Sequence, residues 1–273
     1  MRKLIFFVAL VFLVTISFSG NAKNNEGDTL VLIKTNYGNI TVKLYDKTVK
    51  HKENFLKLVN EGFYNGLLFH RVIRNFMIQG GDPDSKNADK DKKLGGGSLG
   101  YTLPAEIFPE YYHKRGAFAM ARRGGLWNPE KRSSASQFYI IQGEVYTPGQ
   151  LDTLVMRRNE NRKRQIFSLE LARREKEANE LKAKKDYDAL KQLLVDVRLK
   201  TDTLFEKEGP FKFSDEQRKV YTTIGGYPSL DGEYTVFGEV VDGMDVVDKI
   251  AEVKTDQYNR PLENIEMQMK LDK

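Results

Sequence analysis

The chain has 273 residues, with 44 lysines and arginines against 38 aspartates and glutamates, so its formal net charge is +6. Such a small positive excess does not indicate a nucleic-acid-binding protein. Cysteine is absent, which excludes disulfides and thiolate metal sites, and with only three histidines a zinc centre is not expected.

The first 22 residues have the pattern of a secretory signal peptide. Arg2 and Lys3 precede an apolar run at 4–16, and small and polar residues follow it. The run is shorter than the about 20 residues that a membrane span needs. We therefore expect a signal peptide at 1–22, cleaved after Ala22, and export to the periplasm or the medium without further membrane attachment. An uncleaved anchor is the alternative.

Short strand patterns follow the signal. Residues 29–47 alternate apolar and polar on both sides of "NYGN", which predicts a hairpin. Residues 48–62 have helical spacing, with Thr48 as N-cap and Gly62 as the stop. "SQFYIIQG" and "EYTVFGEVV" predict further strands, "MDVVDKIAEV" a second helix and "ENIEMQMKL" a last strand. Many short strands with two helices indicate an all-β barrel or sandwich.

One segment departs from this pattern. Between Gly149 and Gly209, 59 residues contain neither glycine nor proline, and apolar residues recur at helical spacing. A single helix of this length would extend about 90 Å, so we expect two antiparallel helices that turn near residues 184–187. The sequence predicts a solvated helical hairpin at 149–208, inserted between barrel segments at 28–148 and 209–273. A functional alternative is an arm that binds a protein partner.

The stretch "FHRVIRNFMIQGGDP", residues 69–83, is apolar except for a few polar positions that include Arg71 and Gln79. Burying such groups costs several kcal/mol unless they are paired. A three-residue loop at 74–76 would place Arg71 opposite Gln79, whereas a two-residue loop would place them on opposite faces. In the first register both polar side chains lie above Met77, and an apolar pocket with hydrogen-bond donors is typical of a ligand site.

"GGGSLG", residues 95–100, matches the dinucleotide-binding fingerprint only in its letters. That motif needs a strand before it and a helix after it. Here the charged segment "KNADKDKK" precedes it and Pro104 follows, so no nucleotide site is expected.

Five segments, in this order, resemble the cyclophilin family of peptidyl-prolyl isomerases: "FHRVIRNFMIQGGDP", "GGGSLGYTLPAEI", "GAFAMARR", "SASQFYIIQG" and "LDGEYTVFGEVVDGMDVVDKI". The resemblance covers about 29–146 and 222–271. It implies a mainly β fold: a closed eight-stranded antiparallel barrel capped by two helices, with the helical hairpin as an insertion.

The resemblance also implies site residues. Arg71 matches the family's catalytic arginine, and Gln79 matches the glutamine that holds this arginine and the substrate. The substrate-binding positions are matched by Phe76, Met77, Ala121, Arg122, Gln137, Tyr139, Leu230 and Tyr234.

Several matched positions depart from the family pattern. Arg122 replaces an asparagine and Tyr139 a phenylalanine, while Ser229 and Tyr234 stand where many members have tryptophan and histidine.

The function implied is isomerisation of X-Pro bonds in exported or unfolded chains, without covalent intermediate, metal or cofactor. An arginine would stabilise the twisted prolyl amide. The expected partners are proline-containing segments rather than nucleic acid. The alternative is a non-catalytic chaperone or scaffold that binds proline peptides, and the presence of Arg71, Phe76, Met77 and Gln79 favours the enzyme.

Overall fold

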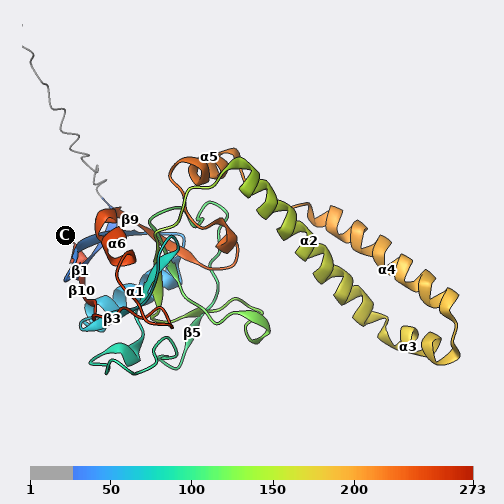
Figure 1. Cartoon of the computed structure of the whole chain (residues 1–273), viewed down its shortest axis with the longest axis horizontal. Coiled ribbons are helices and arrows are strands. Elements are labelled where there is room, and N and C mark those ends of the chain that lie inside the picture. The colour runs from blue at the N-terminus through green and yellow to red at the C-terminus, as the bar shows by residue number, and fades with distance from the viewer. Residues whose placement is uncertain (1–26, 273) are drawn as a thin grey trace, which may run out of the picture.

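The computed structural model describes residues 27–272 apart from the side chain of Leu126, so the predicted signal peptide at 1–22 lies outside the described residues. Eight strands close into an antiparallel barrel in the order β1-β10-β3-β4-β8-β6-β9-β2 (Figure 1). These strands are β1 (Thr29–Thr35), β2 (Gly38–Leu44), β3 (Leu67–Ile73), β4 (Met77–Gly80), β6 (Ala117–Met120), β8 (Phe138–Ile141), β9 (Val236–Asp242) and β10 (Glu266–Asp272). The predicted closed eight-stranded barrel is confirmed.

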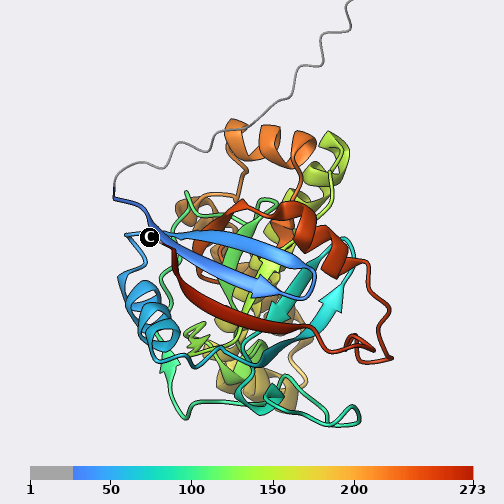
Figure 2. The same cartoon turned by 90° about the vertical axis from the view of Figure 1, so that its left-hand side faces the viewer.

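A hairpin, a small separate sheet and short 3₁₀ turns add detail to the barrel part of the chain. The predicted first hairpin is β1–β2, and Figure 2 shows it lying beside β10. A separate two-stranded sheet pairs β5 (Thr102–Leu103) with β7 (Ser133–Ser134). Three single turns of 3₁₀ helix are present at η1 (Pro83–Ser85), η2 (Gly125–Trp127) and η3 (Pro228–Leu230).

Two helices cap the barrel and contribute to its core. The helix α1 (Val49–Asn60) buries Phe55, and α6 (Met244–Ala251) buries Val247 in the same apolar cluster. The ring of Phe55 lies 5.1 Å from that of Tyr64 and 5.2 Å from that of Phe118, centroid to centroid. Since each aromatic ring buries a large apolar area, this cluster is a main source of the barrel's stability.

The capping of α1 agrees with the sequence in position but not in chemistry. Thr48 is the N-cap residue, yet its hydroxyl donates to the Tyr45 carbonyl at 3.0 Å instead of accepting from the helix. Gly62 follows the C-cap with φ +68°, a backbone conformation that glycine adopts without strain.

Strands β6 and β8 are buried on both faces, which determines where a site can form. Phe138 and Ile140 of β8 point into the barrel core, whereas Tyr139 and Ile141 belong to a second apolar cluster on the outer face. Residues of β6 divide between the two clusters in the same way. Alternation along a strand thus places an apolar surface outside the barrel as well as inside.

The inserted segment forms a long arm that projects from the barrel (Figure 1). It contains α2 (Pro148–Arg173), α3 (Glu175–Lys184) and α4 (Tyr187–Glu208). The chain reverses at 185–186, inside the predicted turn. The sequence predicted one continuous helix before this turn, and that prediction is wrong. Helix α2 ends at Arg173, Arg174 interrupts the helical run, and the separate helix α3 packs on α4.

The base of the arm packs against a helix that the sequence did not predict, α5 (Asp215–Thr223). Leu151 at the start of α2 is fully buried with Phe213 and with Tyr221 of α5. The arm is therefore solvated along most of its length but anchored at its base. Among residues 27–272, no helix combines the length and apolar character needed to cross a membrane.

Candidate active site

The hairpin of β3 and β4 sets the register of the site. Residues 74–76 form a three-residue loop, with Asn75 at φ +60°, so Arg71 pairs with Gln79. Gln79 in turn pairs with Tyr139 on β8, and Tyr139 with Ala119 on β6. Paired residues share a face, so a row of side chains crosses four strands on the outer face of the barrel. Of the two registers that the sequence left open, the structure has the one with the three-residue loop.

A pocket of about 470 Å³ lies over this row, which we call the outer-face pocket. Its lining includes nine of the ten predicted site residues: Arg71, Phe76, Met77, Gln79, Ala121, Arg122, Tyr139, Leu230 and Tyr234. The tenth, Gln137, lies behind the wall and contacts the lining through Gln79. The structure thus brings all ten residues together at one place, while the role of each stays a prediction.

Consecutive hydrogen bonds through two glutamine side chains hold the guanidinium of Arg71. Arg71 Nη1 donates to Gln79 Oε1 at 3.2 Å, and Gln79 Nε2 donates to Gln137 Oε1 at 3.1 Å. Gln137 Nε2 then donates to the carbonyl of Gly97 at 2.9 Å. Arg71 has no carboxylate partner among the described residues, and its half-buried position lowers its pKa. Arg71 therefore presents a positioned cation that is not neutralised by the protein.

The glycine-rich loop at 95–97 forms one rim of the pocket. Gly95 and Gly96 line it, and the buried carboxylate of Asp82 accepts hydrogen bonds from the main chain of Gly95 and Gly97. A Cβ on Gly97 would lie 2.0 Å from Asp82 Oδ1, so a side chain cannot be accommodated there. The run "GGGSLG" thus serves close backbone packing, which agrees with the absence of the strand and helix of a nucleotide motif.

The side chain of Arg122 is not free in this structure. Its Nε donates to the Glu233 carbonyl at 2.7 Å, its Nη2 lies 3.0 Å from Glu233 Oε2, and its guanidinium stacks over the Tyr234 ring at 4.6 Å. The main-chain N–H and C=O of Arg122 make no hydrogen bond to any other residue within 27–272. Any peptide contact at this position would therefore be made by the backbone rather than by the side chain.

Behind the pocket lies a buried hydrogen-bond network. Tyr139 Oη is 3.0 Å from His113 Nε2, His113 Nδ1 is 3.0 Å from Asp231 Oδ1, and Tyr221 donates to Asp231 Oδ2 at 2.6 Å. Burial raises the pKa values of Tyr139 and Tyr221, so both hydroxyls stay protonated. His113 thus lies between the Tyr139 hydroxyl and the Asp231 carboxylate, with one of them at each ring nitrogen. The network connects the pocket wall to α5 at the base of the arm.

Sequence reasoning missed His113, Asp231 and Tyr221, and also Tyr227, whose ring stacks 4.2 Å from that of Phe76. One signal was available: Tyr139 replaces a phenylalanine, and a buried tyrosine hydroxyl needs a hydrogen-bond partner. The partner itself lies 26 residues away, and no local pattern identifies it. Across 27–272, no group of three or more carboxylate or histidine side chains is arranged to hold a metal ion.

Comparison with known proteins identifies the family of this chain. The family model "Cyclophilin type peptidyl-prolyl cis-trans isomerase/CLD" matches residues 30–167 and 212–270. A Staphylococcus saprophyticus protein named as a peptidyl-prolyl cis-trans isomerase is 27% identical over 247 residues, which cover 90% of this chain and 92% of that protein. A Streptococcus pyogenes protein, named as a phosphatase and peptidyl-prolyl cis-trans isomerase, is 30% identical over 245 residues. This chain spans only 38% of its length.

Solved structures support the fold. A Cryptosporidium parvum cyclophilin type peptidyl-prolyl cis-trans isomerase superimposes with a TM-score of 0.51 at 21% identity, covering 90% of this chain and 98% of the other. A second structure of that protein, determined in the presence of the dipeptide Ala-Pro, gives a TM-score of 0.50. The chain belongs to the cyclophilin-type peptidyl-prolyl cis-trans isomerase family.

Proposed function

We propose that this protein catalyses cis-trans isomerisation of X-Pro bonds in extended or unfolded polypeptide segments, with the proline ring in the outer-face pocket. The observation that carries the proposal is the pairing of an uncompensated guanidinium, Arg71, with the apolar floor formed by Phe76 and Met77. Phe76 and Met77 hold a pyrrolidine ring, and Arg71 lies beside the amide that must rotate.

The chemistry requires only differential stabilisation of a twisted amide. Amide resonance gives X-Pro rotation a barrier of about 18–20 kcal/mol, and no covalent bond is broken. In the twisted transition state the prolyl nitrogen regains a lone pair, to which the Arg71 guanidinium donates a hydrogen bond. This contact is absent in the planar ground state, so it lowers the barrier. A reduction of about 5 kcal/mol accelerates rotation several thousand-fold.

The test is NMR exchange spectroscopy on a short peptide with one Ala-Pro bond, at a protein concentration far below that of the peptide. We expect cis and trans signals to exchange on a subsecond time scale instead of the uncatalysed tens to hundreds of seconds. Peptide binding without faster exchange would support the alternative of a non-catalytic chaperone or scaffold. An absence of both would remove the outer-face pocket as a proline site.

We also propose that the protein acts after export and that its arm contacts client chains. The N-terminal pattern at 1–22 supports export, and N-terminal sequencing of the protein from cell fractions tests it. The arm exposes large apolar side chains, including Leu169 (60%), Tyr187 (67%) and Leu199 (62%), which suits weak contacts with unfolded segments. Arm-dependent refolding of a proline-containing protein would support this role.

A further inference from the structure

A second cavity lies on the other side of the segment that closes the outer-face pocket. It has a volume of about 630 Å³ and lies between residues 154–165 of α2, the chain at 205–213 and the segment 228–233. We call it the arm groove. Leu230 lines the outer-face pocket while its neighbour Ser229 lines the arm groove. An extended polypeptide that crosses this segment from the pocket therefore enters the groove.

The two carboxylates of the arm groove are already paired. Glu208 accepts from Arg162 in a two-pronged contact at 2.8–3.0 Å. Glu233 accepts from Lys131 at 2.8 Å, in addition to its contact with Arg122. Among the described residues that line the groove, no carboxylate is thus left to neutralise further cations.

Two further arginines of α2 line the groove without such a partner. Arg157 and Arg158 form no ion pair with any residue between 27 and 272. The guanidinium of Arg158 stacks on the Phe211 ring at 3.8 Å, and its Nη2 lies 2.8 Å from the position that a Cβ on Gly232 would occupy. Arg158 is therefore held half-buried between the arm and the pocket segment, and its guanidinium donates no hydrogen bond to any of the residues 27–272.

The groove wall is fixed by the backbone around Phe211. Asn159 Oδ1 accepts from the Phe211 N–H at 2.8 Å, and Asn159 Nδ2 donates to the Phe211 carbonyl at 3.2 Å. This double contact ties α2 to the chain that follows α4. A preorganised guanidinium binds a carboxylate at a lower entropic cost than a freely rotating one.

We propose that the arm groove binds an acidic side chain of the same polypeptide whose proline occupies the outer-face pocket. The inference rests on the proposed function and adds a substrate class: proline segments with a nearby aspartate or glutamate. Its carboxylate pairs with Arg158, assisted by Arg157. Charge complementarity and the shared segment at 228–233 support this occupant.

The geometry also sets where the acid stands relative to the proline. Gly232 is two residues from Leu230, so their Cα atoms are at most about 7 Å apart. An extended substrate advances about 3.3 Å per residue. An acidic residue about two to four positions from the proline, on one side only, therefore reaches Arg158.

The test uses peptides with one proline and glutamine at all flanking positions, in which a single glutamate replaces each glutamine in turn. Affinity is measured by fluorescence anisotropy and turnover by NMR exchange, and the Glu/Gln ratio is taken at each position. We expect about three- to tenfold tighter binding with glutamate two to four residues from the proline on one side. This preference falls toward one in the Arg157→Gln/Arg158→Gln double variant and at 500 mM salt.

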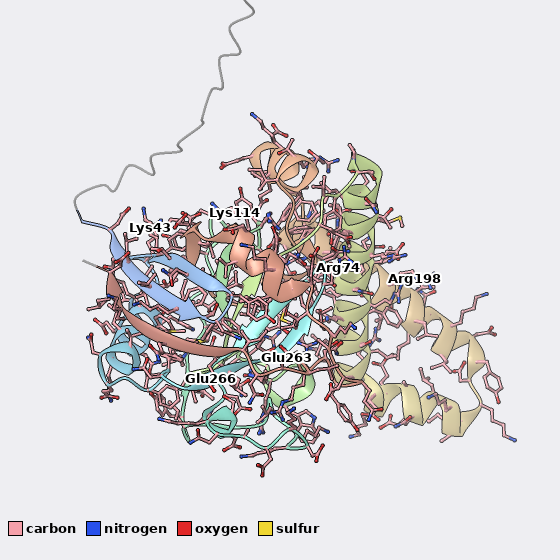
Figure 3. The ribbon with its side chains drawn as sticks, turned by 60° about the vertical axis from the view of Figure 1, so that its left-hand side comes forward. Lys43, Arg74, Lys114, Arg198, Glu263 and Glu266 are labelled. Carbon is pink, nitrogen blue, oxygen red and sulfur yellow. The ribbon has the colours of Figure 1, made fainter. Side chains whose placement is uncertain are left out.

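An arginine outside the groove and a charge reversal inside it serve as controls. Arg198 is an exposed arginine of α4 outside the groove (Figure 3), and Arg198→Gln should retain the preference. Arg157→Glu/Arg158→Glu should reverse it, favouring a lysine peptide. Equal binding of glutamate and glutamine peptides by the unaltered protein, or a preference that survives in the double variant, would overturn the inference. If the glutamine peptide is not isomerised, that result counts against the proposed function. The Glu/Gln binding ratio would still show whether the arm groove binds an acidic side chain.

Discussion

At the scale of single residues, the site depends on polar side chains placed in an otherwise apolar sheet. Arg71 and Gln79 could be identified from the sequence because two polar groups in an apolar stretch need a partner or a ligand. Their register could not, because the sequence left two loop lengths open and only the structure shows the three-residue loop at 74–76. His113 and Asp231 could not, because they are 118 residues apart and each stands in an irregular segment. Only the closed barrel brings them together.

Gln79 positions Arg71, so its replacement should affect turnover more than binding. Gln79→Leu removes the acceptor for Arg71 Nη1 and the donor to Gln137. A displaced guanidinium should lower kcat by about 10- to 100-fold with a smaller change in KM. Steady-state kinetics on one proline peptide measure this split. A change confined to KM would show that Gln79 only binds substrate.

Buried histidines make the stability of the fold sensitive to mild acid. Burial lowers the pKa of His70 from 6.5 to about 4, and also lowers the pKa of His51. Between pH 6.5 and 4 the unfolded chain binds more protons than the folded one, so stability rises with pH in this window. The contribution of neutral His70 is complete above pH 6.5 and is lost as the pH falls toward 4.

Urea unfolding at pH 7 and pH 5 measures this contribution. For His70 the free energy of unfolding should fall by about 2 kcal/mol between these values. His70→Gln, which cannot titrate at this position, should show a smaller fall than the unaltered protein. Equal pH dependence in the two proteins would contradict the assignment.

At the scale of elements, α5 connects the arm to the pocket wall. Its Tyr221 is fully buried and donates to Asp231, which adjoins Leu230 and orients His113. The sequence indicated the helical arm because a long segment without glycine or proline, with apolar residues at helical spacing, favours helix over strands and turns. It did not indicate the break at Arg174, which no breaker residue marks, nor α5, whose nine residues are too few for a clear periodic pattern.

Tyr221→Phe tests this connection. The substitution leaves Asp231 Oδ2 without its 2.6 Å donor inside the protein, which should lower the free energy of unfolding by about 1–2 kcal/mol. Tyr187→Phe is the matched control, because Tyr187 on α4 is 67% exposed and forms no hydrogen bond through its hydroxyl among the described residues. Thermal unfolding of both variants measures the difference. Equal stability of the two variants would show that the Tyr221 hydroxyl contributes nothing.

At the scale of the whole molecule, the barrel and the distal arm have separate cores. The distal arm buries Ala178, Leu193 and Val197 in a cluster of its own, whereas the base of the arm packs on α5. Figure 3 shows side chains projecting outward along the arm, with Arg198 among them. Family motifs in the sequence were sufficient for the barrel and the pocket. The arm groove was not predictable, since it arises from the angle at which an inserted helix meets the segment 228–233.

Shortening the arm should therefore leave the barrel intact. Replacing residues 169–199 with six Gly and Ser residues bridges helices about 8–10 Å apart and keeps the base of the arm. We expect peptide exchange within about twofold of the full chain, and slower refolding of a proline-limited protein if the arm contacts clients.

Removing 150–208 instead deletes the buried Leu151 and should lower the free energy of unfolding by several kcal/mol. Loss of peptide exchange in the variant that lacks residues 169–199 would show that the distal arm contributes to the site.

The most direct test of the central claim is the exchange rate of a bound Ala-Pro peptide on the full protein and on Arg71→Ala. Arg71 faces the outer-face pocket and lies outside the barrel core, so the variant should keep its unfolding temperature and still bind the peptide. We predict that cis-trans exchange on the variant falls by at least about 100-fold, because the donor to the twisted prolyl nitrogen is lost. Undiminished exchange on a folded Arg71→Ala protein would contradict the claim that this guanidinium drives the isomerisation.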